Sequence, residues 1–235
     1  MSDTLLEGRV ILVTGATGAL GSVAAKACAQ AGATVVLLGR TVRKLELLYD
    51  AILAAGAPKP AIYPLDLSGA TENDYAELAE ALTRELGGLH GLMHCAAELG
   101  HLGPLADIDG MRWQRLLHIN LTAPFLLTQA LIPLMTKAGE GKVIFVGDSA
   151  VGDGKAFWGA YGVAKSGLAT YSRILDEESA SFGVRAKVFT PGPMRSPIRL
   201  RAYPGESLAA LPEPRVHTET IVRLLGHNDF SLLSA

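Results

Sequence analysis

Residues 9–25 read Arg-Val-Ile-Leu-Val-Thr-Gly-Ala-Thr-Gly-Ala-Leu-Gly-Ser-Val-Ala-Ala, with glycines at positions 15, 18 and 21. The Val- and Ile-rich start is typical of a buried parallel strand, and the Ala- and Leu-rich end is typical of a helix. A strand, a glycine turn and a helix in this order bring backbone N–H groups and a positive helix end to one point, which suits a pyrophosphate. The stretch therefore predicts a dinucleotide site. The alternative is a tight strand–helix turn that binds no ligand.

Apolar strand-like runs alternate with helical segments along the chain, which is the pattern of a doubly wound parallel sheet with helices on both faces. Residues 1–235 are thus expected to form one α/β domain. Residues 191–216 are rich in proline and are expected to form an irregular loop on the substrate side. We expect strands near 9–14, 34–38, 60–65, 90–95, 142–147 and 185–190, and helices near 19–31, 42–55, 72–87, 112–137, 159–182 and 217–226.

The bulk composition excludes several classes of protein. A net charge of −2 offers no electrostatic attraction to nucleic acid or to an anionic membrane. The N-terminus lacks the basic and apolar regions of a signal peptide, and no apolar run reaches the roughly 18 residues of a membrane span. Cys28 and Cys95 are too few for a disulfide framework, and His90 and His94 lie on a predicted strand without further ligands. We expect a cytoplasmic protein with no metal, nucleic acid or membrane partner.

Tyr161 and Lys165 are four residues apart in a predicted helix, so their side chains share one helix face. A neighbouring ammonium favours the phenolate, and we expect Lys165 to lower the pKa of Tyr161 from its usual value of about 10. A tyrosine of lowered pKa can exchange protons near neutral pH. Ser149 lies twelve residues before Tyr161 and supplies a candidate hydroxyl donor. The alternative for the Tyr–Lys spacing alone is an ordinary solvated helix pair.

Arg40 follows the second predicted strand, where the adenosine ribose of a dinucleotide would lie. An acidic residue at this point would accept hydrogen bonds from the 2′-hydroxyl and would repel a 2′-phosphate. A guanidinium can instead bind a phosphate through two hydrogen bonds. We therefore expect NADP(H) in preference to NAD(H). The alternative is that Arg40 is a solvated arginine at the start of a helix.

These residues together resemble the short-chain dehydrogenase/reductase family, in its short single-domain branch. The resemblance runs from about residue 6 to residue 197. It implies a Rossmann-like fold and an NAD(P)-dependent oxidoreductase that interconverts a carbonyl and a secondary alcohol. It also implies a homodimer or homotetramer. The matching residues follow the family's order: Thr14-Gly15…Gly21, Asp66-Leu67, Cys95-Ala96-Ala97, Asn120, Ser149, Tyr161 with Lys165, and Pro191-Gly192.

The resemblance implies a role for each matching residue. Tyr161 would be the general acid in reduction, Lys165 would lower its pKa, and Ser149 would donate to the substrate oxygen. Asn120 would help to hold a water for proton relay, although by itself it reads as a buried amide. The implied cofactor contacts are Gly15, Thr17, Gly18, Leu20, Gly21, Arg40, Asp66, Leu67, Ala96, Tyr161, Lys165, Pro191, Gly192 and Ser196. For Asp66 a helix-cap role is the alternative, and for the last three residues a strand-end turn.

Several positions depart from the family pattern. Ala19 replaces a glycine of the turn, Cys95-Ala96-Ala97 replaces Asn-Ala-Gly, and the family's last strand has no clear counterpart near the C-terminus. The family's commoner spacing of thirteen residues before the tyrosine would select Asp148, which donates no proton when ionised, so Ser149 is chosen. These departures favour one alternative function, a non-catalytic nucleotide-sensing or interaction protein on the same fold. The intact Ser149, Tyr161 and Lys165 favour the enzyme.

Overall fold

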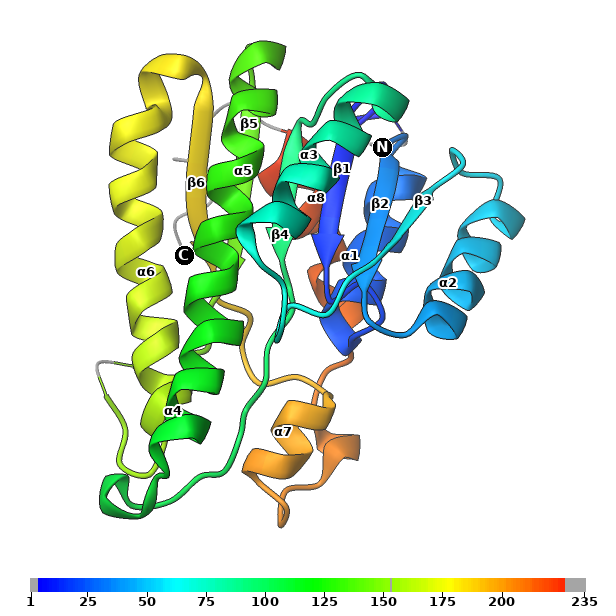
Figure 1. Ribbon diagram of the computed structural model, residues 1–235. Helices are drawn as coiled ribbons and strands as arrows, with labels where there is room; N and C mark the ends of the chain where they lie inside the picture. The colour runs from blue at the N-terminus through cyan, green and yellow to red at the C-terminus, as the bar shows by residue number, and fades with distance from the viewer. Residues whose placement is uncertain (1–3, 153, 227–235) are drawn as a thin grey trace.

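The computed structural model describes residues 4–152 and 154–226, and within them six parallel strands form one sheet (Figure 1). The strand order is β3-β2-β1-β4-β5-β6, which confirms the doubly wound architecture. Every strand begins and ends within one residue of its predicted range. The strands are β1 (Val10–Thr14), β2 (Thr34–Gly39), β3 (Ala61–Pro64), β4 (Gly91–His94), β5 (Gly141–Val146) and β6 (Val184–Phe189).

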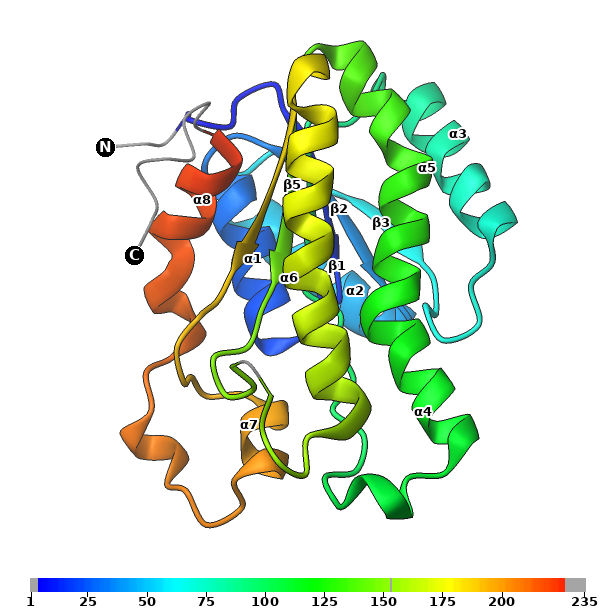
Figure 2. The same cartoon turned by 90° about the vertical axis from the view of Figure 1, so that its left-hand side faces the viewer.

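Helices cover both faces of the sheet, so its central strands are fully buried (Figure 2). One apolar core lies between the sheet and the helices α1 (Ala19–Gln30), α2 (Val42–Ala54) and α8 (Thr218–Gly226). A second core lies between the opposite face and the helices α3 (Glu72–Leu86), α5 (Ala123–Ala138) and α6 (Gly159–Ser179). Burial on both faces explains why the strands read as continuous apolar runs rather than as alternating patterns.

The helix predicted over 112–137 is interrupted. It consists of α4 (Gly110–Leu117), a π-helical turn over His118–Thr122, and α5. Pro124 lacks the N–H that would bond to the Asn120 carbonyl in a regular helix, and the wider turn lies just before it. The whole stretch is long and apolar enough in composition to cross a membrane. Its inner face, with Leu127 and Leu131 fully buried, instead packs in the second core.

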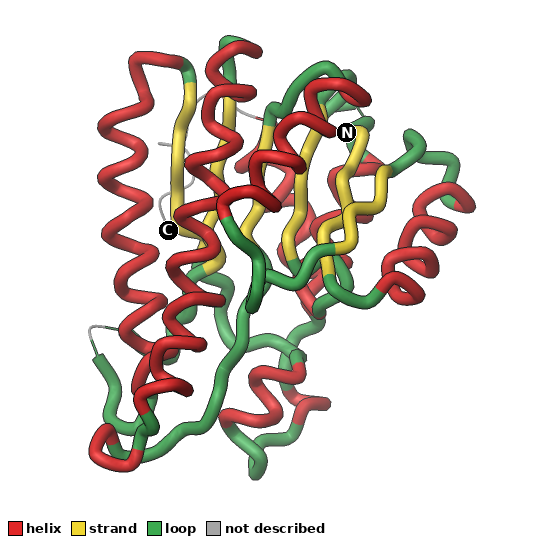
Figure 3. Tube along the Cα trace, in the orientation of Figure 1, coloured by secondary structure: helices red, strands yellow, loops and turns green. Residues whose placement is uncertain are grey.

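The segment 191–216 is more regular than expected. It contains the short helix α7 (Pro197–Ala202) and 3₁₀ turns at Leu208–Ala210 and Pro214–His217, which lie beyond the lower end of the sheet (Figure 3). The side chain of Ser196 begins α7 by accepting a hydrogen bond from the Arg199 N–H at 3.0 Å. The guanidinium of Arg195 donates to the carbonyls of Ala209 and Leu211. The expected absence of a last strand concerns residues 227–235, which lie outside the described residues.

The sheet order reverses beside β1, because β1 pairs with β2 on one side and with β4 on the other. The connections from β1 and β4 therefore leave the sheet in opposite directions and open a crevice at the carboxyl ends of the strands. This crevice is where a ligand is expected in an open α/β sheet. The loops after β1, β4 and β5 and the α7 segment surround it.

Candidate active site

A cleft of about 790 Å³ lies at the carboxyl edge of the sheet. Two predicted catalytic residues, Asn120 and Ser149, are not among the residues that line it. Every residue predicted from the sequence to contact the cofactor lines the cleft: Gly15, Thr17, Gly18, Leu20, Gly21, Arg40, Asp66, Leu67, Ala96, Tyr161, Lys165, Pro191, Gly192 and Ser196. The tertiary structure thus brings residues from six separate chain segments to one place.

The glycine turn after β1 is shaped by close backbone contacts. Gly15 has φ of +59°, and a Cβ there would lie 2.8 Å from the Cα of Ala96. A Cβ on Gly21 would collide with the Gly15 carbonyl. Gly18 is the N-cap of α1, and no side chain caps that helix end. The first N–H groups of α1 therefore face the cleft without a side-chain partner, an arrangement that fits a pyrophosphate. Ala19 at the first helical position does not disturb this geometry.

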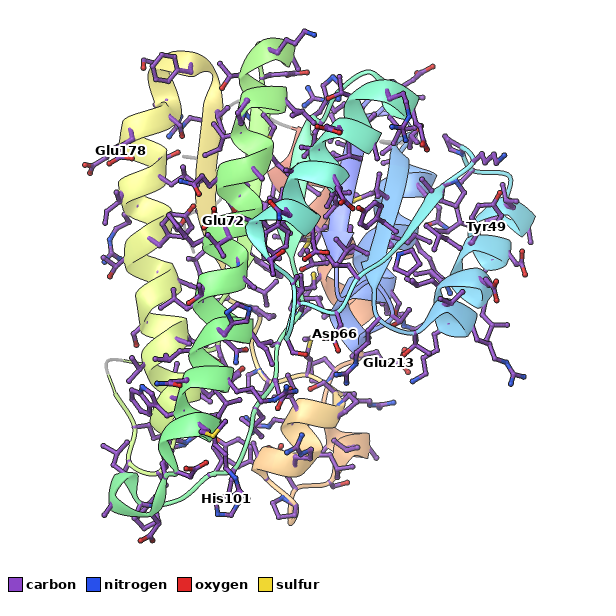
Figure 4. The ribbon with its side chains drawn as sticks, in the orientation of Figure 1. Tyr49, Asp66, Glu72, His101, Glu178 and Glu213 are labelled. Carbon is purple, nitrogen blue, oxygen red and sulfur yellow. The ribbon has the colours of Figure 1, made fainter. Side chains whose placement is uncertain are left out.

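The far end of the cleft is lined by Arg40 and Lys44, which follow β2, and by Asp66, which follows β3. In Figure 4, Asp66 lies between the sheet and the α7 segment. The backbone N–H of Ser68 donates to the Asp66 carboxylate at 3.0 Å, and this hydrogen bond, helped by the charge of Arg40, lowers the pKa of Asp66. The two cations leave this end of the cleft positive, which fits an anionic ribose phosphate.

Asn120, in the π-helical turn, holds the loop that follows β4. Its side-chain oxygen accepts from the Glu98 N–H at 3.0 Å, and its amide donates to the carbonyls of Glu98 and Leu116, both at 2.9 Å. Asn120 is buried, and both of its amide hydrogens are used in these bonds. The structure therefore shows Asn120 as the residue that positions the β4 loop, and its water-holding role stays a prediction.

Tyr161 and Lys165 come from the first turns of α6 and lie on the same face of that helix, as the spacing predicts. Both are nearly fully buried, with exposed fractions of 3% and 5%. The Lys165 Nζ lies 5.6 Å from the centre of the Tyr161 ring and donates to the Val146 carbonyl at the end of β5, at 2.7 Å. This carbonyl fixes the ammonium beside the phenol inside the cleft.

Asp148, rather than Ser149, lies beside the phenol. The Tyr161 hydroxyl donates to one Asp148 carboxylate oxygen at 2.8 Å, and the Ala150 N–H donates to the other at 2.8 Å. Ser149 is exposed and does not line the cleft. The choice of Ser149 from the sequence is corrected here: the second residue after β5 points into the cleft, and the third points away from it.

The surroundings of Tyr161 also reverse the expected direction of its pKa. Burial raises the pKa of Tyr161, and the negative charge of Asp148 and its hydrogen bond with the phenol raise it further. Burial lowers the pKa of Lys165 to about 8, although Asp148 and Cys95 act in the opposite direction. Burial and the Asp148 carboxylate together favour the neutral phenol.

The remaining wall of the cleft combines aromatic and apolar side chains with charged ones. The Trp158 ring centre lies 5.8 Å from that of Tyr161 and 6.0 Å from that of Tyr203. Arg199 in α7 pairs with Glu206 and lies 3.7 Å from the Tyr203 ring centre. Sequence reasoning did not single out Arg199 or Tyr203, because only the folded α7 segment brings them to the cleft. Among residues 4–152 and 154–226, no cluster of three or more His, Cys, Asp or Glu could hold a metal ion.

The fold and the cleft define a dinucleotide-binding α/β protein with a buried Tyr–Lys pair at the inner end of its ligand site. The family model described as short chain dehydrogenase matches residues 9–206, and the chain belongs to that family of NAD(P)-dependent oxidoreductases.

Relatives in this family are similar over nearly the whole chain. The uncharacterised oxidoreductase YciK of Escherichia coli (strain K12) is 35% identical over 210 residues, which cover 89% of this chain and 83% of YciK. A structure from Pseudomonas syringae assigned to the short chain dehydrogenases is 40% identical, with a TM-score of 0.92 and coverage of 95% and 91% of the two chains. A structure from Escherichia coli CFT073, complexed with NADPH, is 34% identical, with a TM-score of 0.92 and coverage of 97% and 94%.

Proposed function

We propose that the protein is an NADP(H)-dependent oxidoreductase that interconverts a polar double bond and its reduced form. One observation carries this proposal: the uncapped glycine turn, Arg40 and the buried Tyr161–Lys165 pair all line the same cleft. The bound nicotinamide would supply a hydride to the substrate carbon or accept one from it. The carbonyl and secondary alcohol expected from the sequence are the general substrate pair for such a site.

The preference for NADP(H) is supported by the positive end of the cleft. Arg40 and Lys44 both line it, and a guanidinium can bind a 2′-phosphate through two hydrogen bonds. The similar chain from Escherichia coli CFT073 is complexed with NADPH. The glycine turn would hold the pyrophosphate through backbone N–H groups, which bind either cofactor equally well. Arg40 and Lys44 are therefore the residues that would distinguish the two cofactors.

We infer that Tyr161 donates the proton whenever the substrate has to be protonated during reduction. Its hydroxyl lies at the inner end of the cleft and carries a transferable hydrogen, and the Lys165 ammonium lies beside it. As the phenol gives up its proton, the positive charge of Lys165 stabilises the phenolate that forms. Asp148 opposes this step, because its negative charge favours the neutral phenol.

We also infer that the protein forms a homodimer. Phe125 on α5 and Val163 and Ile174 on α6 are exposed apolar residues, with exposed fractions of 41%, 49% and 49%. The two helices lie side by side on one face of the sheet (Figures 1 and 2). Packing of these helices against the same helices of a second copy would remove the apolar side chains from water.

A cytoplasmic location stays a prediction from the sequence.

The proposed function is tested by cofactor titration followed by a substrate panel. NADPH is expected to bind more tightly than NADH, and ketones and imines added to the NADPH complex are followed by loss of nicotinamide absorbance. On the best ketone, Tyr161→Phe is expected to lower kcat by about 100-fold or more, since general acid catalysis contributes that much. The NADPH Kd should change by less than about twofold, because the change removes one hydroxyl.

Two results would contradict the proposal. A protein that binds neither cofactor has no dinucleotide site. A protein that binds NADPH tightly but reduces no compound in the panel, in either the wild type or a variant of Asp148, is instead a nucleotide-sensing protein. The presence of a carboxylate beside Tyr161 is the observation that favours this second function.

A further inference from the structure

The carboxylate of Asp148 lies in the cleft beside the Tyr161 hydroxyl. Both of its oxygens accept hydrogen bonds, one from the Tyr161 hydroxyl and one from the Ala150 N–H, each at 2.8 Å. An ionised carboxylate has acceptors only, so this arrangement satisfies the charged form. Asp148 also lines the cleft itself, so its charge faces a bound ligand.

This arrangement suits a hydrogen-bond donor better than an acceptor. The single hydroxyl hydrogen of Tyr161 points to Asp148, so the phenol presents its lone pairs to the cleft. A carbonyl oxygen would compete for that hydrogen, and the negative charge that develops on it during reduction would lie next to a carboxylate. A protonated nitrogen would instead donate to Asp148, and its positive charge would be stabilised there.

Aromatic rings form part of the cleft wall near Asp148. The Trp158 ring lies beside the phenol, and the Tyr203 ring lies beside Trp158. The Lys155 ammonium lies 5.4 Å from the Trp158 ring centre and 5.2 Å from that of Tyr203, so these rings already accept a cation. Arg199 pairs with Glu206, and Arg115 pairs with Glu98. The Lys165 ammonium donates to the Val146 carbonyl, and its charge also acts on Asp148. Within the described ranges, no salt bridge to Asp148 is formed.

We propose that the substrate is an iminium, a protonated carbon–nitrogen double bond, and that the protein reduces it to an amine. The N–H of the iminium would donate to Asp148, and the Trp158 ring would cover its apolar part. This inference rests on the proposed function, because it assigns the substrate class of the same site.

The reaction balances without a proton from the protein. The reduced nicotinamide supplies a hydride, two electrons and one hydrogen, to the carbon of the C=N⁺ group. The π electron pair becomes the lone pair of nitrogen, so the cation becomes a neutral amine while the nicotinamide becomes oxidised. Because the nitrogen arrives with its proton, Tyr161 keeps its own and orients Asp148, which stays a carboxylate throughout.

The first test compares turnover of ring-matched substrates with NADPH: 1-pyrroline against cyclopentanone, and 3,4-dihydroisoquinoline against 2-tetralone. The wild type is expected to show a kcat/KM at least about tenfold higher for the imines. Asp148→Ser, which exchanges the charge for a hydroxyl donor, is expected to reverse this preference by shifting the ratio about 100-fold. In a protein that keeps Asp148, Tyr161→Phe should reduce turnover of the imines far less than that of the ketones.

The second test measures binding without turnover. Tetrahydroisoquinolinium and NADPH cannot react with each other, so their complex with the protein mimics the proposed substrate complex. Calorimetry on the NADPH-bound protein is expected to show a Kd for this cation that is at least about tenfold weaker in Asp148→Asn. Glu98→Gln is the matched control, a cleft carboxylate that pairs with Arg115, and it should change that Kd by less than about twofold. An unchanged NADPH Kd in each variant shows that the fold is intact.

The outcomes separate this inference from the proposed function. Faster reduction of ketones than of imines by the wild type, or a ratio unchanged in Asp148→Ser, overturns the iminium and leaves an NADP(H)-dependent oxidoreductase. Asp148-dependent binding of the cation without any turnover supports recognition of a protonated nitrogen and overturns the oxidoreductase. If the protein shows neither turnover nor Asp148-dependent binding of the cation, both proposals are overturned.

Discussion

At the scale of single residues, one carboxylate changes the chemistry of the site. Lys165 lies where the Tyr–Lys spacing predicts, yet the pKa of Tyr161 is raised rather than lowered. Burial removes the water that would stabilise a phenolate, and Asp148 adds a negative charge in hydrogen-bond contact. A positive neighbour is therefore not sufficient to lower a tyrosine pKa, because the sum of burial and all nearby charges decides its direction.

Lys165 should make stability depend on pH in a defined window. Its pKa is about 8 in the folded protein, because of burial, and about 10.4 in an unfolded chain. Between these two pH values the unfolded state binds more protons than the folded state, so the free energy of unfolding rises with pH. The stability that Lys165 contributes at high pH is therefore lost as the pH falls through 8. Lys165→Met removes that contribution.

The measurement is urea unfolding of the wild type and Lys165→Met at about pH 7.5 and about pH 9.5. The free energy of unfolding of the wild type minus that of the variant is expected to increase between the two pH values. Use of the difference removes the effects of groups that titrate alike in both proteins, such as Cys28 and Tyr75. A difference that stays constant or decreases would show that Lys165 titrates normally in the folded state.

Arg40 should decide the choice of cofactor. Arg40→Ala is expected to weaken NADPH binding by about tenfold or more, since a charge-assisted hydrogen bond contributes about 1.5–3 kcal/mol, and to change NADH binding little. Arg43→Ala is the matched control, because Arg43 is an exposed arginine in α2, three residues after Arg40, and does not line the cleft. Fluorescence titration of both variants measures the two affinities. Equal losses of affinity for NADPH and NADH would show that Arg40 does not contact the 2′-phosphate.

At the scale of elements, the glycine turn and the start of α1 form one unit. Gly15 lies against Ala96 after β4, and Gly21 lies against the Gly15 carbonyl, so the turn packs on itself and on the neighbouring strand end. Close packing holds the first N–H groups of α1 towards the cleft. A glycine at position 19 is not needed, because Ala19 is a helical residue with ordinary backbone angles.

Gly21→Ala should damage this unit. Its new Cβ would collide with a carbonyl that cannot move without opening the turn, so we expect NADPH affinity to fall by at least about tenfold and stability to fall by about 1–3 kcal/mol. Gly110→Ala is the matched control, since a Cβ at the start of α4 meets nothing within 4 Å. Cofactor titration and urea unfolding check both. Normal NADPH binding by Gly21→Ala would show that the turn does not hold the pyrophosphate.

At the scale of the whole molecule, the outward faces of α5 and α6 should hold two copies together. Light scattering is expected to give a mass about twice the 24.7 kDa of the chain. Ile174→Glu places a charge in the proposed interface and should yield a monomer at micromolar concentration. Leu47→Glu on α2 replaces an exposed apolar residue outside that face and should leave the dimer intact. A monomeric wild type would contradict the dimer.

Much of the fold follows from local pattern. Six apolar runs became six strands, and the helix ranges differ from the observed ones mainly at their ends. The exceptions have physical causes. The π-helical turn lies before Pro124, which cannot donate the regular helix hydrogen bond, and the α7 helix forms where Pro197 and the Ser196 cap begin a helix inside a proline-rich segment.

The sequence by itself determined the strands, the strand–glycine turn–helix unit and the shared helix face of Tyr161 and Lys165, because strand and helix periodicity follow local rules. Only the tertiary structure decided between Asp148 and Ser149 and set the direction of the Tyr161 pKa. The thirteen-residue spacing indicated Asp148, but the requirement for a proton donor favoured Ser149. Only the backbone path after β5 shows which of the two side chains enters the cleft. A pKa depends in turn on burial and on charges brought from distant segments, and those exist only in the folded chain.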